Sequence, residues 1–513
     1  MKNRAFTTLM AFMLFFCIQS IGAYAEKSNG EFQIAWVGEL GPEARKSFEE
    51  EKVKEKEPDQ KEVSPPINEI QKQIDQLQEE VQIYFDKSDD FYKKKWTISG
   101  YLESENYFAA IKDKESSIEN EKNILKKVEA HSKMDISYGD NVAYAKAVIH
   151  GYVYPENREE NENYYKNSCI VQELYISALF PTFDIQLGKQ IIRWGTANSI
   201  NPTSYFNPLN LTEALLKDAD EIYIGVFSIS STLLIKDYSL KLVFVPVHSP
   251  ARLPSPNSLW ELRWPNQSIP GTGMAFPIEY EPYNEPLDRE IKNSGIGARF
   301  SGTAMGFDFS ISSYHGPDKD LTLLPEAYID FFNPNNSKII LVPQYKVISA
   351  IGGDIAFSIG DFTLQVETSY IFDKPAIQNT ANMQSMEIEI EKVGYLYCET
   401  GINWRISDDF NIIIEYVKGI YTSDEDKYMK PFFSELAILS AERKFLDSRF
   451  ALGIQGMYNT SDRDFQVVPK IGWDFQNGFI MELSGAVFYG EKDTFFGIYD
   501  ERSIVILRAK YHF

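Results

Sequence analysis

Cysteine, histidine and long apolar runs are scarce in this 513-residue chain. Its three cysteines and five histidines follow no spacing typical of a metal site, and they offer no framework of disulfides. The chain also lacks a Gly-x-Ser-x-Gly elbow, a His-Glu-x-x-His motif and a phosphate-binding loop. We therefore expect no enzyme, cofactor or metal, and interpret His150, His248 and His315 as interfacial or loop histidines without catalytic partners.

The hydropathy excludes a helical membrane protein. Hydrophobic residues make up 43% of the chain and the mean hydropathy is -0.30, whereas membrane helices need repeated apolar runs of about 20 residues. A membrane β-barrel is not excluded, because its strands alternate between polar and apolar residues. The aromatic content of 14% suits girdles at lipid–water interfaces. By composition alone, an aromatic-rich soluble β-protein remains an alternative.

The N-terminus carries the features of an export signal. Lys2 and Arg4 precede an apolar run at 9–16, and Ala23-Tyr24-Ala25 fits the small-x-small cleavage rule. We predict that residues 1–25 are a signal peptide. Because this segment holds two bases and no acid, its removal takes the net charge from −23 to −25. Such an acidic chain is a poor partner for nucleic acid.

Two segments of different composition follow the signal. Residues 26–66 are too charged to pack and are predicted to form a flexible linker. In 67–86, apolar residues recur at steps of three and four: Ile67, Ile70, Ile74, Leu77, Val81 and Tyr84. This pattern predicts a short periplasmic helix, either a monomeric amphipathic helix or a coiled coil. A coiled coil would make the protein a homo-oligomer.

From Trp96 to Phe513 the pattern changes to period two. In the last segment, Val505, Leu507, Ala509, Tyr511 and Phe513 share one face, and Arg508 and Lys510 lie on the other. A strand with one apolar and one charged face fits between lipid and a wet lumen. We therefore predict an all-β fold, with residues 96–513 forming a transmembrane antiparallel β-barrel in contact with outer-membrane lipids.

The connections between the segments alternate in length. Short turns, such as those at 140–141 and 236–237, alternate with long polar loops, such as those at 195–221 and 249–293. This alternation is typical of a barrel with periplasmic turns and outward loops. The pattern predicts about 18 strands with both termini periplasmic, or about 16 if the first two segments are not strands.

The chain's end and one internal stretch carry resemblances. A final Phe513 that closes an alternating strand with Tyr511 resembles the assembly signal of bacterial outer-membrane proteins, which implies contact with their assembly machinery. The stretch from Leu187 to Glu221 resembles a largely uncharacterised family of bacterial outer-membrane porin-like barrels. Its shared residues are Gly188, Gln190, Trp194, Gly195, Asn201, Pro202, Asn207 and Pro208. Ser204 stands where many relatives have Asp. The resemblance implies a porin-type barrel without a settled substrate.

On this strand count the same stretch is predicted to be the third outward loop, which in porins folds inward. Its two Asn-Pro pairs restrict the backbone and suit a fixed inward fold. The candidate constriction residues flank the loop: Arg193, Trp194, Asp218, Asp220 and Glu221. Opposed charges across a constriction screen solutes by charge. A structured surface loop is the alternative, and Lys189 and Arg193 are compatible with either the lumen or the lipid side.

The inward faces of the predicted strands carry charges of both signs. The candidate lumen-wall residues are Asp308, Glu367, Glu399, Glu415, Glu482, Arg299 and Arg508. A mixed, slightly acidic lumen predicts a water-filled pore with a weak cation preference, although such groups can also pair across a plugged lumen.

Together these features predict an outer-membrane, porin-like channel for passive diffusion of small hydrophilic solutes or ions. The alternative is a surface adhesin or ligand-binding receptor on a closed barrel. That alternative rests on the long loop at 249–293, which is rich in proline and aromatic residues. The sequence does not identify the solute or ligand.

Overall fold

The computed structural model describes residues 94–109, 125–153, 168–213, 216, 219–256, 258–264, 267–268, 275–281, 287–330, 332–333, 336–378, 390–423, 427–431 and 433–513. The chain divides into Met1–Lys93 and Lys94–Phe513. The predicted signal peptide (1–25), linker (26–66) and helix (67–86) lie outside the described residues and stay predictions.

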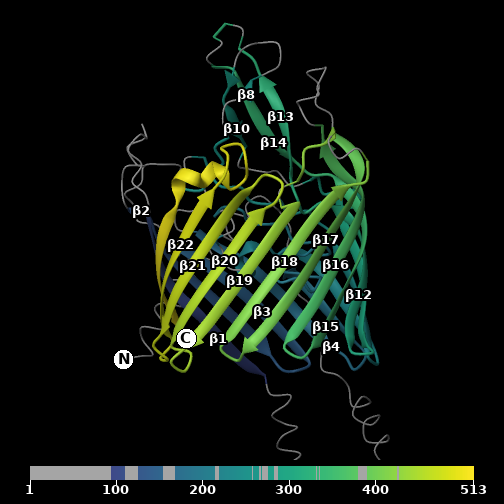
Figure 1. The fold of residues 1–513 in the computed structure, drawn as a ribbon. Helices are drawn as coiled ribbons and strands as arrows, with labels where there is room; N and C mark the ends of the chain where they lie inside the picture. The colour runs from purple at the N-terminus through teal and green to yellow at the C-terminus, as the bar shows by residue number, and fades with distance from the viewer. Residues whose placement is uncertain are drawn as a thin grey trace, which may run out of the picture. The chain divides into compact units, whose positions relative to one another are not determined.

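The second unit is a closed antiparallel β-barrel (Figure 1). In the described part of the chain its wall is one sheet of 18 strands, which confirms the predicted fold and the larger strand number. The strands are β1 (Lys95–Ala109), β2 (Leu125–Gly139), β3 (Ala143–Val153), β4 (Ser168–Leu179), β5 (Phe183–Gln190), β6 (Val226–Ile235), β7 (Tyr238–Val245), β11 (Gly295–Ala304), β12 (Phe307–Pro317), β15 (Val347–Ile359), β16 (Phe362–Ile377), β17 (Ile390–Ser407), β18 (Phe410–Tyr421), β19 (Glu435–Phe445), β20 (Phe450–Asn459), β21 (Asp464–Asp474), β22 (Phe479–Tyr489) and β23 (Ile504–His512).

Each wall strand pairs with its neighbours in the chain, and β23 pairs with β1 to close the ring. Beyond β23, the Phe513 N–H donates to the Gly100 carbonyl at 3.0 Å, and the Gly100 N–H donates to the Phe513 carbonyl at 3.1 Å. Closure leaves no free edge in the described wall, so wall backbone groups find partners between strands, as a lipid environment demands. The last residue of the chain is therefore part of the seam.

Side chains alternate between the two faces of the wall. In β6, Ser228 and Ser230 are buried inside, whereas Phe227 and Ile229 are exposed on the outside. The same holds around the ring, where exposed apolar residues include Leu174, Ile176, Leu242, Ile296, Ile311, Ile351, Val366, Ile414, Leu439, Leu483 and Val487. So large an exposed apolar surface belongs against lipid rather than water. Among the described residues, no helix is long and apolar enough to cross a membrane.

The two ends of the barrel differ. At the end that holds the C-terminus the turns are short: Asp140, for example, accepts the N–H groups of Val142 and Ala143 at 2.8 Å. At the other end, two long loops carry the short strands β8 (Gln267–Ser268), β9 (Ala275–Phe276), β10 (Ile278–Tyr280), β13 (Thr322–Tyr328) and β14 (Lys338–Gln344). Strands β10, β14 and β13 form a small sheet that projects beyond the wall (Figure 1).

Candidate functional site in the barrel lumen

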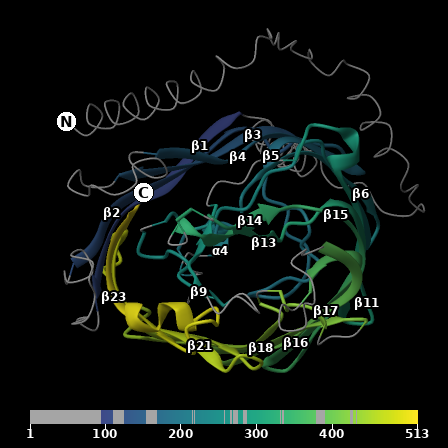
Figure 2. The ribbon, with the colours of Figure 1, turned by 90° about the horizontal axis from the view of Figure 1, so that it is seen from above.

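The connection between β5 and β6, residues 191–225, is called the inward loop here because it lies inside the ring. The helical turn α4 (Ala219–Ile222) of this loop is within the ring of strands when the barrel is seen from above (Figure 2). Residues 201–208 are all buried. A buried stretch that includes Asn, Thr and Ser needs hydrogen-bond partners, and the barrel wall provides them.

Asn207, from the second Asn-Pro pair, closes the neck of the inward loop. Its side-chain oxygen accepts the Ile192 N–H at 2.6 Å. Its amide group donates to the carbonyls of Gln190 at 3.2 Å and Ile224 at 2.7 Å. One side chain thus ties together the two ends of a long loop, and it is fully buried in doing so.

Aromatic packing holds the loop against the wall. The rings of Trp194 and Phe206 meet edge to face at 4.9 Å, and Tyr205 stacks on Tyr314 of β12 at 5.2 Å. Gly297 on β11 makes room, because a Cβ there would lie 2.7 Å from the Phe206 ring and 2.9 Å from that of Trp194. Trp194, a candidate constriction residue, is therefore a packing residue that is 2% exposed.

Glu367 of β16 anchors the tip of the loop. Its carboxylate accepts the main-chain N–H groups of Thr196 at 2.9 Å, Ala197 at 3.1 Å and Thr203 at 2.7 Å. The Thr203 hydroxyl donates a further bond at 2.8 Å. Hydrogen bonds to an ionised carboxylate are roughly twice as strong as neutral ones. This fully buried acid therefore acts as the receptor for the loop backbone.

Glu415 of β18 extends the same anchor. It accepts the N–H groups of Asn198 at 2.7 Å and Ser199 at 3.3 Å. The Gln365 amide links it to Glu399 by donating to both carboxylates, at 3.1 and 3.3 Å. The three acids Glu367, Glu399 and Glu415 are at most 1% exposed. They face inward, as expected, but they are buried and do not line open water.

The other candidate lumen-wall residues form ion pairs or lie near the short-turn end. Arg299 pairs with Asp354 at 3.3 Å. Arg508 pairs with Glu482 at 2.8 Å and with Glu105 of β1. Asp308 is exposed and accepts the Thr303 hydroxyl. Much of the inward charge is thus neutralised locally.

The charged residues that flank the loop are only partly brought together. The exposed Arg193 guanidinium lies 5.1 Å above the Tyr223 ring, and Glu221 accepts the Tyr101 hydroxyl of β1. Asp218 and the side chain of Asp220 lie outside the described residues, so a field between opposed charges stays a prediction. Lys189 is paired across the sheet with Leu174 of β4 and Phe227 of β6, which are both exposed. Its ammonium group donates to the Val171 carbonyl at 2.7 Å.

A cavity of about 280 Å³ lies between the inward loop and the opposite wall. Residues 198–201 form one side, and the other side includes Gln455, Gln466, Ser484 and Arg508 of β20 to β23. The charged side chains around it are Lys319, Asp320, Lys374, Lys470 and Arg508. Lys374 bonds to Asp318 at 2.8 Å and Asp320 at 3.0 Å. Among the described residues, Lys470 has no carboxylate within ion-pair distance.

The sequence analysis missed a histidine pair in the lumen. His131 of β2 and His150 of β3 are both buried, with ring nitrogens 2.9 Å apart. His150 is therefore not an isolated interfacial residue. The short turn after β2 sets the register that places His150 opposite Lys133 and His131 opposite Tyr152. Counting back from that turn is the signal that could have found the pair.

No curated protein matches the chain. Among solved structures, the chain is similar to OmpF of Salmonella typhi in complex with daunomycin (8% identity, 83% of this chain, 99% of the other, TM-score 0.41). It is also similar to OccK8 (OprE) of Pseudomonas aeruginosa (9% identity, 82% of this chain, 99% of the other, TM-score 0.45). A third similar structure is the outer membrane channel DcaP of Acinetobacter baumannii (10% identity, 82% of this chain, 97% of the other, TM-score 0.39).

A family described as "Protein of unknown function (DUF1302)" matches residues 4–424. This span contains the inward loop, its Asn-Pro pairs and the anchoring acids Glu367 and Glu415. This match to an uncharacterised family is consistent with the family resemblance that was predicted from the sequence. The chain is a member of the DUF1302 family.

Proposed function

We propose that this protein is an outer-membrane channel for passive diffusion of small hydrophilic solutes or ions. The observation that carries the proposal is the anchoring of the inward loop by Glu367, which fixes the loop on one side of the lumen and leaves a cavity on the other. A barrel of this strand number has room for an aqueous lumen, unlike one of eight strands. The inward loop then acts as the constriction.

The lining favours anionic solutes rather than the weak cation preference expected from the sequence. Of the acids that suggested cations, Glu367 and Glu415 are occupied by the inward loop, and Glu399 is buried and bonded to Gln365. Lys374 and Arg508 are balanced by carboxylates, whereas Lys470 is not balanced by any described one. An uncompensated base in the described lining of this cavity weakly attracts anions.

The outer-membrane location is supported by the exposed apolar band and by the closed wall. These features make outer-membrane lipids the surroundings of the barrel. Export through the signal peptide, contact with the assembly machinery and homo-oligomer formation belong to the same proposal and rest on the sequence.

A receptor or adhesin is the second candidate, and the sheet of β10, β14 and β13 favours it. In this sheet Ile278 to Tyr280 pair in parallel with Ile339 to Leu341 of a different loop. Two loops joined in this way form a folded outer platform rather than separate flexible connections.

Conductance distinguishes the two candidates. Purified, heat-modifiable protein in planar bilayers is expected to give stepwise currents with a weak anion preference, and replacement of Glu367 by Ala is expected to enlarge the steps. If neither protein conducts, although both are folded, the channel proposal fails and the receptor proposal takes its place. A cation preference overturns only the charge assignment.

A further inference from the structure

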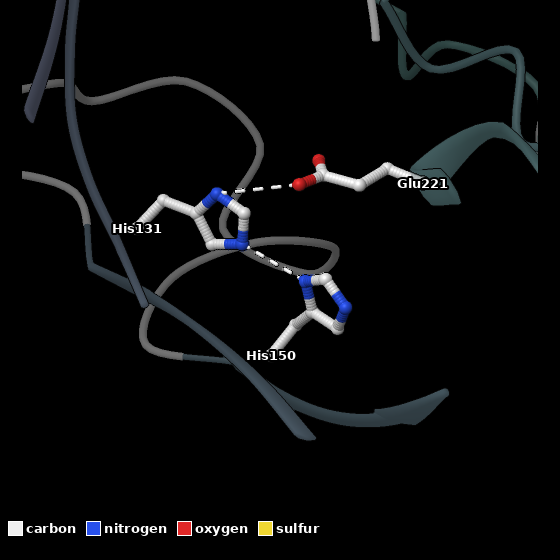
Figure 3. A group of neighbouring side chains, drawn as sticks. All are labelled: His131, His150 and Glu221. Carbon is white, nitrogen blue, oxygen red and sulfur yellow. Dashed lines mark hydrogen bonds and ion pairs between the residues drawn. The ribbon is translucent and has the colours of Figure 1, made fainter. Parts of the chain in front are cut away.

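Three side chains with metal-binding atoms meet between the wall and the inward loop (Figure 3). His131 comes from β2, His150 from the adjacent β3, and Glu221 from α4 of the loop. One ligand atom from each lies within 4.8 Å of the other two. Both histidines are at least nine-tenths buried, so the arrangement is part of the packed lumen and not a surface coincidence.

The partners of His150 determine which of its nitrogens carries the proton. Its Nε2 lies 2.5 Å from the Gln172 side-chain oxygen. The Gln172 amide nitrogen points the other way and donates to the Tyr223 carbonyl at 3.4 Å. Because an amide oxygen only accepts, Nε2 of His150 is the donor. The lone pair of His150 Nδ1 therefore faces His131 Nε2 at 2.9 Å.

The opposite edge of His131 faces carboxylates. Its Nδ1 is 3.8 Å from an oxygen of Glu103 and 3.8 Å from an oxygen of Glu221. Glu103 also pairs with Lys510 at 2.7 Å. Carboxylates on one side of His131 and the His150 lone pair on the other are groups that attract a metal cation.

We propose that His131, His150 and Glu221 bind a divalent transition metal ion of the Zn²⁺ class. Two imidazoles and a carboxylate are a donor set that zinc accepts, at distances of about 2.0–2.2 Å. His131 turns its Nε2 toward His150 and its Nδ1 toward Glu221. One ion takes one nitrogen of a ring, so binding requires the His131 ring to turn until a single nitrogen faces both partners, whose ligand atoms already lie within 4.8 Å of one another. Gln172 holds the His150 ring in the orientation that a metal ligand needs.

A metal here connects the inward loop to the wall. Glu221 belongs to the loop, whereas both histidines belong to the wall strands. The ion therefore adds a cross-link on the side of the lumen opposite the Glu367 anchor. This inference does not depend on conduction, because the site forms equally in a channel and in a closed receptor.

The test is a titration of folded, chelator-treated protein with Zn²⁺ alone. One Zn²⁺ ion per chain is expected to bind. When Co²⁺ replaces Zn²⁺, the visible absorption spectrum should show the bands of a tetrahedral or five-coordinate Co²⁺ ion. The variants His131→Gln, His150→Gln and Glu221→Gln should each weaken binding at least 100-fold. The matched control is His315→Gln, which removes an exposed histidine of β12 and should leave binding unchanged.

Gln172→Ala separates ligation from a general loss of structure. Loss of a group that orients a metal ligand typically weakens affinity about 10–100-fold, so this variant should bind more weakly than the native protein and more tightly than the histidine variants. Heat modifiability checks that each variant is folded. The proposal is overturned if the native protein takes up no Zn²⁺, or if the ligand variants and the His315 control bind it equally.

Discussion

Glu367 occupies the space into which a side chain on Gly195 would project. A Cβ at Gly195 would lie 2.1 Å from a carboxylate oxygen of Glu367, and the backbone φ of Gly195 is +95°. Both the conformation and the close approach thus require glycine. The Trp-Gly pair is explained by this contact, because tryptophan packs the loop and glycine admits the acid.

Gly195→Ala should detach the tip of the inward loop. We expect a free energy of unfolding lower by roughly 1–3 kcal/mol from backbone strain, together with a larger single-channel conductance. Urea titration in detergent and bilayer recordings measure the two effects. Gly306→Ala is the control, because Gly306 also has a positive φ (+82°) but a Cβ there meets nothing within 4 Å. Equal conductance changes in the two variants would contradict the proposed contact.

Glu367→Gln should loosen the loop while it preserves the shape of the side chain. The amide keeps one acceptor oxygen, so buried N–H groups of the loop lose partners at about 1–3 kcal/mol. Limited proteolysis and conductance are expected to increase. Asp308→Asn, at an exposed acid of the same lumen, should change neither, and an effect as large as that of the Glu367 variant would argue against the anchor.

Lys470→Glu should shift the selectivity of the pore toward cations. The substitution changes the charge of the wall by two units. The interaction of each unit with a permeating ion at a distance of 4 Å in water is about 1 kcal/mol. The reversal potential under a salt gradient measures it, and Lys470→Gln should give an intermediate value. Lys292→Glu applies the same charge change to a side chain that is 71% exposed in an outer loop. If it shifts the reversal potential equally, Lys470 does not line the conducting path.

Acid should loosen the outer loop between β7 and β11 through His248. Burial lowers the pKa of His248 from 6.5 to about 4, and its Nδ1 accepts the Leu287 N–H at 3.2 Å. The opened loop binds the proton more readily than the folded loop. The His248 contribution to stability is therefore complete above pH 6.5 and is lost as the pH falls toward 4.

Proteolysis of the intact barrel between pH 7.5 and 4.5 measures this change, and cleavage between residues 246 and 294 should increase on acidification. His248→Gln keeps an acceptor but does not titrate, so it should remove the pH dependence. A pH profile identical to that of the native protein would assign the effect to another group.

Deletion of Phe513 should impair assembly. The deletion removes the last pair of hydrogen bonds with Gly100 and the proposed terminal signal. We expect less of the folded, heat-modifiable form on gels and lower levels of the protein at the cell surface. Phe475→Ala removes another exposed aromatic side chain near the same end of the barrel and should assemble normally. Normal surface levels after deletion would contradict the terminal signal.

The sequence determined the barrel and left its strand number at about 18 or about 16. Alternation along a strand, as in Phe227 to Ser230, is a local property, because successive side chains point to opposite faces. Short turns at every second connection then fix antiparallel neighbours. The first two strands, which decide between 18 and 16, were settled by their pairing in the structure, where β1 pairs with both β2 and β23.

Only the tertiary structure decided which residues the inward-facing side chains contact in the lumen. Glu367 and Thr203 are 164 residues apart, and alternation says that Glu367 points inward without saying what it meets. His131 and Glu221 likewise meet only because the inward loop crosses the lumen. Strand pairing is set by neighbours along the chain, whereas the path of a loop through a lumen is set by contacts with strands that are distant in sequence. The wall could therefore be predicted from the sequence, and the site could not.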